Sequence, residues 1–258
     1  MAQKELAFAK YRKEYILDQL NKTGKVRISS LQDKLRVSAV TLRKDLETLE
    51  QGGLLIRVRG GAITNLLPGE NQPERKNEHY DEKSRIAKAA ASLVHDNESV
   101  LLNVGSTSQF LAHELKTKNN IIILTNAMQI FNEVASCQNL TTIFLGGEYD
   151  PCTGITYSAD TLEQLNKYMA DILFMGVDGL DLHGGATSQN HMGFSVTKQM
   201  LRSSIKRYII ADDRKLGKTA LVHICALDEF DGIITNETPE TISYINDLRN
   251  AGINVITV

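Results

Sequence analysis

The sequence predicts an α/β protein in two parts, and three observations support this fold class. From about residue 80 onward, short apolar runs alternate with amphipathic segments. Before residue 64, apolar residues follow a helical spacing and then alternate, as in helices followed by a β-hairpin. The charge divides at the same place: residues 1–64 carry 13 lysines and arginines against 7 acidic residues, and the remainder carries 16 against 24. A small basic head on an acidic body indicates that only the head binds a polyanion.

The composition is that of a globular protein without a membrane segment. At 258 residues the chain can form a small domain and a medium-sized one. It contains no run of about 18 apolar residues and no continuous apolar stretch near the N-terminus, so we expect neither a transmembrane helix nor a secretion signal. The three cysteines, Cys137, Cys152 and Cys225, form no C-x-x-C pair. Such sparse cysteines favour a reducing cytoplasm and argue against a disulfide framework or a zinc site.

The first 64 residues show the pattern of helices joined by short connections. Apolar residues recur at helical spacing over residues 4–22, and residues 25–28 are interpreted as a short extended link. Ser29 or Ser30 is expected to cap a second helix, because a serine oxygen can accept a bond from a free N–H group of the first turn. A turn at residues 36–37 then separates this helix from a third one.

The third helix is predicted to run from its cap, Ser38, to about Gln51. Its leucines recur at i, i+4 and i+7 and therefore face inward. Its polar residues gather in the first two turns, which is where a helix that enters the DNA major groove needs them. An alternating stretch closed by Gly60 and Gly61 then predicts a hairpin whose arginines can reach phosphates or a minor groove. The candidate DNA-binding residues are Ser38, Ala39, Thr41, Arg43, Lys44, Arg57 and Arg59.

Arg43 and Lys44 carry most of this hypothesis. Arg43 can bond to the O6 and N7 atoms of guanine, whereas Lys44 suits a phosphate and Thr41 a phosphate or a thymine methyl group. The simplest alternative is a solvated helix face, which is common for any basic dipeptide. Two observations weigh against it: the helix caps have the spacing of a helix-turn-helix, and a basic hairpin follows. A winged helix that binds proteins instead of DNA is a further alternative.

Two segments of the head resemble a known family. The segments RVSAVTLRKDLETLE (residues 36–50) and GGLLIRVRGGA (residues 52–62) are similar to the N-terminal signature of the DeoR/GlpR family of bacterial sugar-metabolism regulators. The resemblance implies a winged helix-turn-helix that binds double-stranded operator DNA as part of a homo-oligomer, a dimer or tetramer. It also implies repression of a carbohydrate-metabolism operon, controlled by a phosphorylated sugar or related metabolite. We therefore expect domains at residues 1–64 and 80–258, joined by a linker at residues 65–79.

The remainder of the chain has the pattern of a doubly wound α/β domain. Apolar runs of four to six residues are typical of mostly parallel strands that are buried on both faces. Residues 183–193, rich in Gly, Ser and Asn, are interpreted as a surface loop that could also close over a ligand. We expect strands at residues 99–104, 121–125, 142–145, 172–177, 206–211, 230–235 and 254–258, and helices at residues 83–94, 106–115, 126–136, 159–168, 193–204 and 239–250.

Ligands bind beyond the carboxyl ends of the strands in such sheets, so the residues that follow each strand are candidates. After the first strand, a hydroxyl-rich loop leads into a helix, whose first N–H groups can bind phosphate. A lysine that follows the fifth strand can neutralise an anion. Each feature alone is more often a helix cap or a solvated loop, but together they favour a small anionic effector. The candidate effector-binding residues are Gly105, Ser106, Thr107, Thr125, Asn126, Gly146, Gly147, Asp178, Asp212 and Lys215.

This second part also resembles the sensor domain of the same family, which is similar in fold to ribose-5-phosphate isomerase. Where the family often has carboxylates, this chain has Asn103 and Phe194, the latter four residues before Lys198. A general base must be ionisable, so these replacements argue against catalysis. Because other carboxylates remain, the alternative hypothesis is a sugar-phosphate isomerase-like enzyme with a nucleic-acid-binding head.

The sequence carries no motif for a cofactor or a metal. No G-x-G-x-x-G follows a predicted strand and no Walker A motif is present, so we expect no nucleotide cofactor. The six histidines form no H-x-x-x-H pair. We therefore predict a DNA-binding regulator that is not an enzyme and that uses no cofactor or metal.

Overall fold

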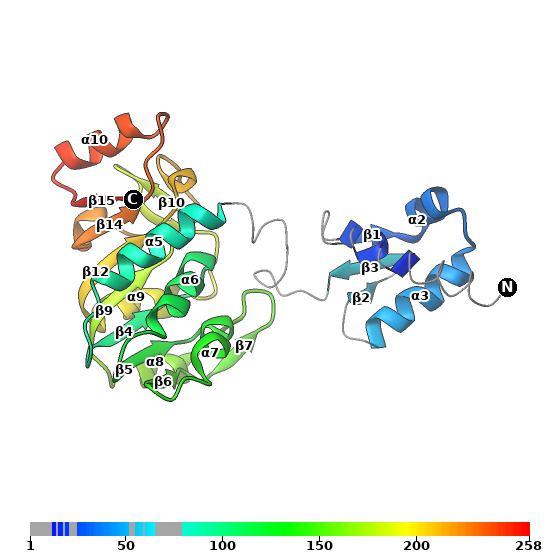
Figure 1. Ribbon diagram of the computed structural model, residues 1–258, viewed down its shortest axis with the longest axis horizontal. Helices are drawn as coiled ribbons and strands as arrows, with labels where there is room; N and C mark the ends of the chain where they lie inside the picture. Colours follow the sequence, from blue (N-terminus) through cyan, green and yellow to red (C-terminus); the bar gives the residue numbers. More distant parts are fainter. Residues whose placement is uncertain are drawn as a thin grey trace. The chain divides into compact units, whose positions relative to one another are not determined.

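The structure, a computed structural model, describes residues 12–13, 15–17, 19–20, 25–51, 55–58, 60–64 and 79–258 (Figure 1). The chain divides into two units, Met1–Glu78 and His79–Val258. Arg59, much of the predicted first helix and residues 65–78 of the predicted linker lie outside the described residues. In the part of the chain that is described, no helix is both long enough and apolar enough to cross a membrane.

The N-terminal unit forms the predicted winged helix-turn-helix. Its three short strands form an antiparallel sheet in the order β1-β3-β2, and Val58 pairs with Gly61 across the hairpin of the wing. A Cβ atom on Gly61 would lie 1.9 Å from the carbonyl oxygen of Val26, so only glycine lets β3 approach β1 this closely. The elements are β1 (Lys25–Arg27), α2 (Ile28–Leu35), α3 (Ala39–Gln51), β2 (Leu55–Val58) and β3 (Gly61–Thr64).

The start of α2 differs from the prediction, because neither Ser29 nor Ser30 caps it. Residues 25–27, predicted as a simple link, pair with β3 as strand β1. The chain leaves this sheet at Arg27, and the N–H group of Ile28 bonds to the carbonyl oxygen of Gly60 at 2.9 Å. The wing thus satisfies an N–H group at the helix start, and the two serines lie inside the helix.

The turn and the start of α3 confirm the prediction. Arg36 adopts a left-handed conformation, with φ of 51°, and ends α2. Ser38 caps α3, because its Oγ accepts a hydrogen bond from the N–H group of Thr41 at 3.1 Å. The inward leucines of α3 are all buried, and they pack with apolar residues of the other elements of the unit. This core contains Ile16, Leu20, Val26, Leu31, Leu42, Leu46, Leu49, Leu55 and Ala62.

The C-terminal unit is built on a seven-stranded sheet in the order β15-β14-β12-β9-β4-β5-β6. Every neighbouring pair in this sheet is parallel. All seven predicted strands are present, with ends within two residues of the expected ones. The strands are β4 (Ser99–Leu102), β5 (Ile121–Thr125), β6 (Leu140–Phe144), β9 (Ala170–Met175), β12 (Ser204–Ile210), β14 (Gly232–Thr235) and β15 (Val255–Thr257).

Helices cover both faces of this sheet, which confirms the doubly wound fold (Figure 1). Along β4, Leu101 belongs to the core on one face, and Val100 and Leu102 belong to the core on the other. Burial on both faces explains why the strands are continuous apolar runs. One face carries α5 (Tyr80–Ser92), α6 (Ser106–Leu115) and α7 (Met128–Val134), and the other carries α8 (Ala159–Leu165), α9 (Phe194–Arg202) and α10 (Ile242–Asn250).

The sequence pattern does not predict two small antiparallel elements. Strands β7 (Glu148–Asp150) and β8 (Ile155–Tyr157) form a hairpin. Strands β10 (Gly179–Asp181), β11 (Gly185–Ser188) and β13 (Val222–Cys225) form a second sheet. The prediction of a surface loop over residues 183–193 is therefore wrong for β11, whose Ala186 and Thr187 are buried. Strands of three or four residues leave too short a pattern to detect. The pairing of β11 with β13 also depends on a distant partner.

Candidate functional site

The first turns of α3 present the predicted basic face to solvent. Arg43 and Lys44 are exposed, and Ser38 is exposed at the cap. Ala39 and Thr41 are half-buried, and the Thr41 Oγ1 lies 2.9 Å from the Ser38 Oγ. The opposite face of α3 packs in the core of the unit. The side chains of Arg43 and Lys44 therefore remain in solvent. The face has the form needed for phosphate and base contacts in a major groove.

A buried ion pair that the sequence analysis missed holds α3 in place. Arg12 donates from Nε to Asp45 Oδ2 at 2.7 Å and from Nη2 to Asp45 Oδ1 at 3.2 Å. The side chains of Arg12 and Asp45 are only 12% and 8% exposed. A sequence signal exists, because Asp45 falls three residues after Leu42 and four before Leu49, on the inward face of the helix. An acidic residue at such a position requires a buried partner.

Arg57 of the wing is held by the last turn of α3. Its backbone N–H group donates to Glu50 Oε1 at 2.9 Å, and its Nε donates to Glu50 Oε2 at 2.6 Å. The hydrogen bonds from the backbone and guanidinium of Arg57 lower the pKa of Glu50, and the bond to Glu50 raises the pKa of Arg57. Both side chains are exposed enough for the pair to reorganise on binding. This arrangement orients the guanidinium while leaving its terminal nitrogens available to an anion.

In the C-terminal unit, β4 is the first strand of the seven-stranded sheet in chain order, and later strands are added first on one side of it and then on the other. The chain proceeds from β4 to β5 and β6, then returns to β9 on the other side of β4 and continues outward to β12, β14 and β15. The connections that leave β4 and β9 therefore run in opposite directions. This is the topological switch point, where ligands bind in open α/β sheets. It brings Asn103, just after β4, next to Gly176, just after β9.

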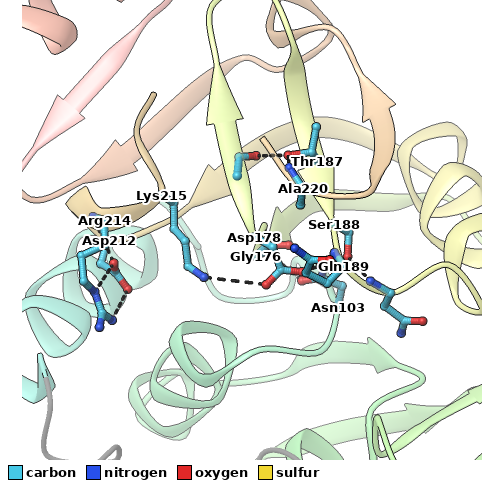
Figure 2. A network of polar contacts seen from close by, with 12 residues as sticks. Asn103, Gly176, Asp178, Thr187, Ser188, Gln189, Asp212, Arg214, Lys215 and Ala220 are labelled. Atoms are coloured by element: carbon cyan, nitrogen blue, oxygen red, sulfur yellow. Dashed lines mark hydrogen bonds and ion pairs between the residues drawn. The ribbon is translucent and has the colours of Figure 1, made fainter. Parts of the chain in front are cut away.

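Asn103 joins the ends of β4 and β9 at this point. Its Nδ2 donates to the carbonyl oxygen of Gly176 at 2.9 Å, and its Oδ1 accepts from the N–H group of Gly176 at 2.8 Å (Figure 2). An amide can donate and accept at once, whereas a carboxylate can only accept. The replacement of an expected carboxylate by Asn103 therefore serves a structural purpose here: the side chain extends the pairing of two parallel strands beyond their last residues.

The hydroxyl-rich loop after β4 leads directly into α6. Gly105 is the N-cap of this helix and offers no side chain to the N–H groups of the first turn. Ser106 is exposed, whereas Thr107 is 7% exposed. The helix is ten residues long, and its dipole makes this end positive. A helix start of this kind can bind an anion, and the contact of these three residues with an effector stays a prediction.

Thr125 and Asn126 have structural hydrogen bonds. The Thr125 Oγ1 donates to the carbonyl oxygen of Leu102 at 2.9 Å and accepts from the N–H group of Ala127 at 3.1 Å. The Asn126 Nδ2 donates to the carbonyl oxygen of Thr156 in β8 at 2.8 Å. Both residues are buried, and this pairing explains why α7 begins after residue 127 and not at 126. Their contact with an effector stays a prediction.

Gly146 and Gly147 lie between β6 and β7 and pack against α8. The N–H group of Gly146 donates to Gln164 Oε1 at 3.0 Å. A Cβ atom on Gly147, whose φ is 142°, would lie 2.1 Å from Thr161 Oγ1, so the glycine permits this close packing. In the sheet order, β6 is four strands away from β12, a separation of about 19 Å. The structure thus does not bring these glycines together with Lys215.

Lys215 and Asp178 face one another at the ends of β12 and β9 (Figure 2). The Lys215 Nζ lies 3.7 Å from Asp178 Oδ1, a distance that is too long for a hydrogen bond. Asp178 Oδ2 instead accepts from the Ser188 Oγ at 3.1 Å and from the N–H group of Gln189 at 2.8 Å. Strand β11, which the sequence pattern missed, therefore positions Asp178. The lysine is held loosely and is 33% exposed.

Asp212, beside Lys215, is a buried carboxylate among cations. Its oxygens accept from Arg214 Nε at 2.9 Å and from Arg214 Nη2 at 3.0 Å. Burial opposes its ionisation, yet the bonds from Arg214 and the charges of Arg214, Lys215 and Lys83 keep the pKa of Asp212 below its ordinary value. Lys83, in the first turn of α5, is itself buried and was not predicted. Asp212 thus organises the cations and is not exposed enough to be the main ligand contact.

Phe194 occupies the start of α9 next to Lys198. The Lys198 Nζ lies 5.8 Å from the centroid of the Phe194 ring, within the range of a cation–π contact. The aromatic ring therefore takes the place beside this lysine where the family resemblance leads us to expect a carboxylate. It can attract the cation but cannot accept a proton.

Comparisons with known proteins find family models that match the N-terminal and the C-terminal parts of the chain. The family model for the DeoR-like helix-turn-helix domain matches residues 12–66, and the one for the DeoR C terminal sensor domain matches residues 78–237. The HTH-type transcriptional regulator IolR of Bacillus subtilis (strain 168) is 30% identical over 91% of this chain and 93% of its own length. The HTH-type transcriptional repressor GlcR of the same organism is 30% identical over 87% of each chain.

About half of the chain is also similar, at low identity, to a solved enzyme structure. Ribose 5 phosphate isomerase A from Neisseria gonorrhoeae is 19% identical, with a TM-score of 0.39 over 52% of this chain and 53% of that one. The two family models together cover the head and most of the sensor unit. The chain belongs to the DeoR family of DNA-binding transcriptional regulators.

Proposed function

We propose that this protein represses a carbohydrate-metabolism operon and that a phosphorylated sugar or related metabolite controls it. The observation that carries the proposal is the pairing of two features in one chain: an exposed basic face on α3, and, at the carboxyl ends of the parallel strands, a loosely held lysine that follows β12 and a helix start that follows β4. The first suits DNA and the second suits a small anion.

The DNA-binding role falls to the first turns of α3 and to the wing. We assign Arg43 to a base edge, and Lys44 and Arg57 to phosphates, because all three side chains are exposed. Because operators with two half-sites match a two-fold protein, we propose a homo-oligomer, a dimer or tetramer, whose two recognition helices lie about 34 Å apart on the DNA. Its place of action is the cytoplasm, where bacterial operators lie.

Replacing Arg43 or Lys44 with alanine is expected to weaken operator binding in two distinguishable ways. Loss of Arg43 should relax the base preference at one position, at a cost of about 1–3 kcal/mol. Loss of Lys44 should weaken binding to all sequences alike and reduce the slope of log K against log[salt] by about 1. Fluorescence anisotropy with labelled upstream DNA at several salt concentrations measures both effects.

The control for this experiment is Lys88→Ala, which removes the same charge from an exposed position on α5 in the sensor unit. We expect its affinity and salt slope to match those of the unchanged protein. If the double variant Arg43→Ala/Lys44→Ala bound the operator as tightly as this control, the placement of DNA on α3 would be wrong.

The sensing role falls to the switch point. The first turn of α6 offers N–H groups and the Ser106 hydroxyl, and Lys215 offers a positive charge that a stronger anion can take from Asp178. We propose that the sensor unit binds its effector without turnover, because Asn103 is committed to Gly176 and Phe194 cannot transfer a proton. Turnover of any phosphosugar by the full chain would instead support the isomerase-like alternative.

Replacing Lys215 with alanine is expected to weaken effector binding by about ten-fold or more, as for loss of one charge-assisted hydrogen bond. The full chain is first screened by thermal shift against ribose 5-phosphate, glucose 6-phosphate and fructose 6-phosphate, because a ligand at about 100 times its Kd adds about 2.7 kcal/mol of stability. The Kd of the sugar that raises Tm is then compared between variants. Lys218→Ala, which removes an exposed lysine three residues away, is the control. Equal affinities of the two variants would exclude Lys215 from the site.

A further inference from the structure

Val40 is a large apolar side chain that the N-terminal unit leaves in solvent. It is 60% exposed, although it lies in the second position of α3. Valine is also a poorer helix former than most residues at an exposed site, because its branched Cβ restricts its rotamers. The side chain of Val40 is therefore available for an intermolecular contact.

Helical spacing places Val40 on the same face as the basic residues. Arg43 and Lys44 follow it by three and four positions, and both are exposed. The leucines that anchor α3 in the core lie on the opposite side. Val40 therefore lies one turn closer to the helix N-terminus than the two cations. The N-terminal turns of a recognition helix are the part that contacts base edges.

We propose that Val40 reads a thymine through the C5-methyl group of that base. In the major groove, thymine alone presents an apolar group, while the other bases present hydrogen-bonding groups at their edges. A valine against the amino group of adenine or cytosine would remove that donor from water without replacing its hydrogen bond. The side chain thus favours thymine by contact and disfavours the other bases by desolvation. This specificity role rests on the proposed placement of α3 in the major groove.

The experiment uses the full chain and begins with selection of binding sites from a random double-stranded DNA pool. Each thymine of the selected half-site is then replaced, one at a time, by deoxyuridine, which lacks only the methyl group. We expect one of these replacements to weaken binding by about four-fold, the value for burial of one methyl-sized apolar group. In the variant Val40→Ala the same replacement should have no effect, while the other replacements should act equally on both proteins.

The matched control is Val58→Ala, because Val58 is the other exposed valine in the described part of this unit, at 45%, and lies on the wing. It should keep the full response to deoxyuridine. Alanine is a good helix former, so Val40→Ala should fold. If every thymine replacement changed the affinity of the unchanged protein and of Val40→Ala by the same factor, the proposal would be overturned. Failure of the unchanged protein to select any sequence would overturn the DNA-binding assignment itself, which is a different result.

Discussion

Replacing Asp45 with alanine is expected to destabilise the N-terminal unit by about 3–5 kcal/mol, the cost of breaking a buried ion pair by removing one partner. Two charge-assisted bonds between Arg12 and Asp45 would be lost. The guanidinium of Arg12, 12% exposed, would then lose the carboxylate to which it donates both bonds. Because native proteins have only about 5–15 kcal/mol of stability, such a loss removes a large fraction of it and should make the unit open more often, without any change at the DNA-binding face itself.

Hydrogen exchange in the full chain measures this effect separately in each unit. The amides of α3 should exchange faster in Asp45→Ala, while those of the sensor unit should be unchanged. Glu47→Ala is the control, since it removes an exposed acid from the same helix. The double variant Arg12→Met/Asp45→Leu should restore much of the protection, because apolar residues of similar volume can replace a buried ion pair. Unchanged exchange in Asp45→Ala would show that the pair contributes little.

This ion pair also shows where inference from sequence stops. The leucine spacing of α3 was sufficient to predict which face is buried, and Ser38 was identified as its cap from local chemistry alone. Both depend on residues within a few positions of each other. The partner of Asp45 is 33 residues away, and nothing in the local pattern selects Arg12 for this role. For the same reason the partner of Arg57 could not be predicted, although Glu50 is only seven residues away.

In the sensor unit, the seven parallel strands could be predicted because each is buried on both faces and so is apolar throughout. Strand β11 could not, since it is only four residues long and, besides its neighbour β10, pairs with a strand more than thirty residues later. The position of the candidate site could be predicted, because ligands bind beyond the carboxyl ends of the strands in such sheets. The roles of the individual side chains could not be predicted. A threonine or asparagine after a strand can serve a ligand or the backbone, and Thr125 and Asn126 bond to the backbone.

The second large effect that we expect is a loss of stability of the sensor unit when Asp212 is replaced. Replacing it with asparagine keeps the shape of the side chain but removes the charge that faces Arg214, Lys215 and Lys83. The new amide group can accept on one side only, and its NH₂ group would point at a guanidinium that also donates. Because Arg214 is 38% exposed, solvent reduces the loss relative to a fully buried pair. We expect the sensor unit to lose about 2 kcal/mol at pH 7.

The pH dependence of this loss has a defined sign. The pKa of Asp212 is lower in the folded protein than in the unfolded chain, so its ionised form stabilises the fold at every pH above the unfolded value of about 3.9. This contribution disappears as the pH falls through the folded-state pKa. Urea unfolding of the full chain, followed by far-UV circular dichroism because the chain has no tryptophan, should therefore show a stability difference that is constant near neutral pH and shrinks below about pH 4.

The comparison variant is Asp247→Asn, which changes an exposed acid on α10 and should leave the unfolding transition of the sensor unit nearly unaltered. If Asp212→Asn were as stable as this variant at pH 7, the carboxylate would not be the residue that holds the cations in place. If the difference grew as the pH fell, Asp212 would be stabilised in its protonated form, contrary to its bonds with Arg214. A loss of stability with the expected pH dependence, accompanied by weaker effector binding, would link the buried carboxylate to the position of Lys215. Asp212 would then act on the effector through the lysine that it orients, since the carboxylate itself is 2% exposed.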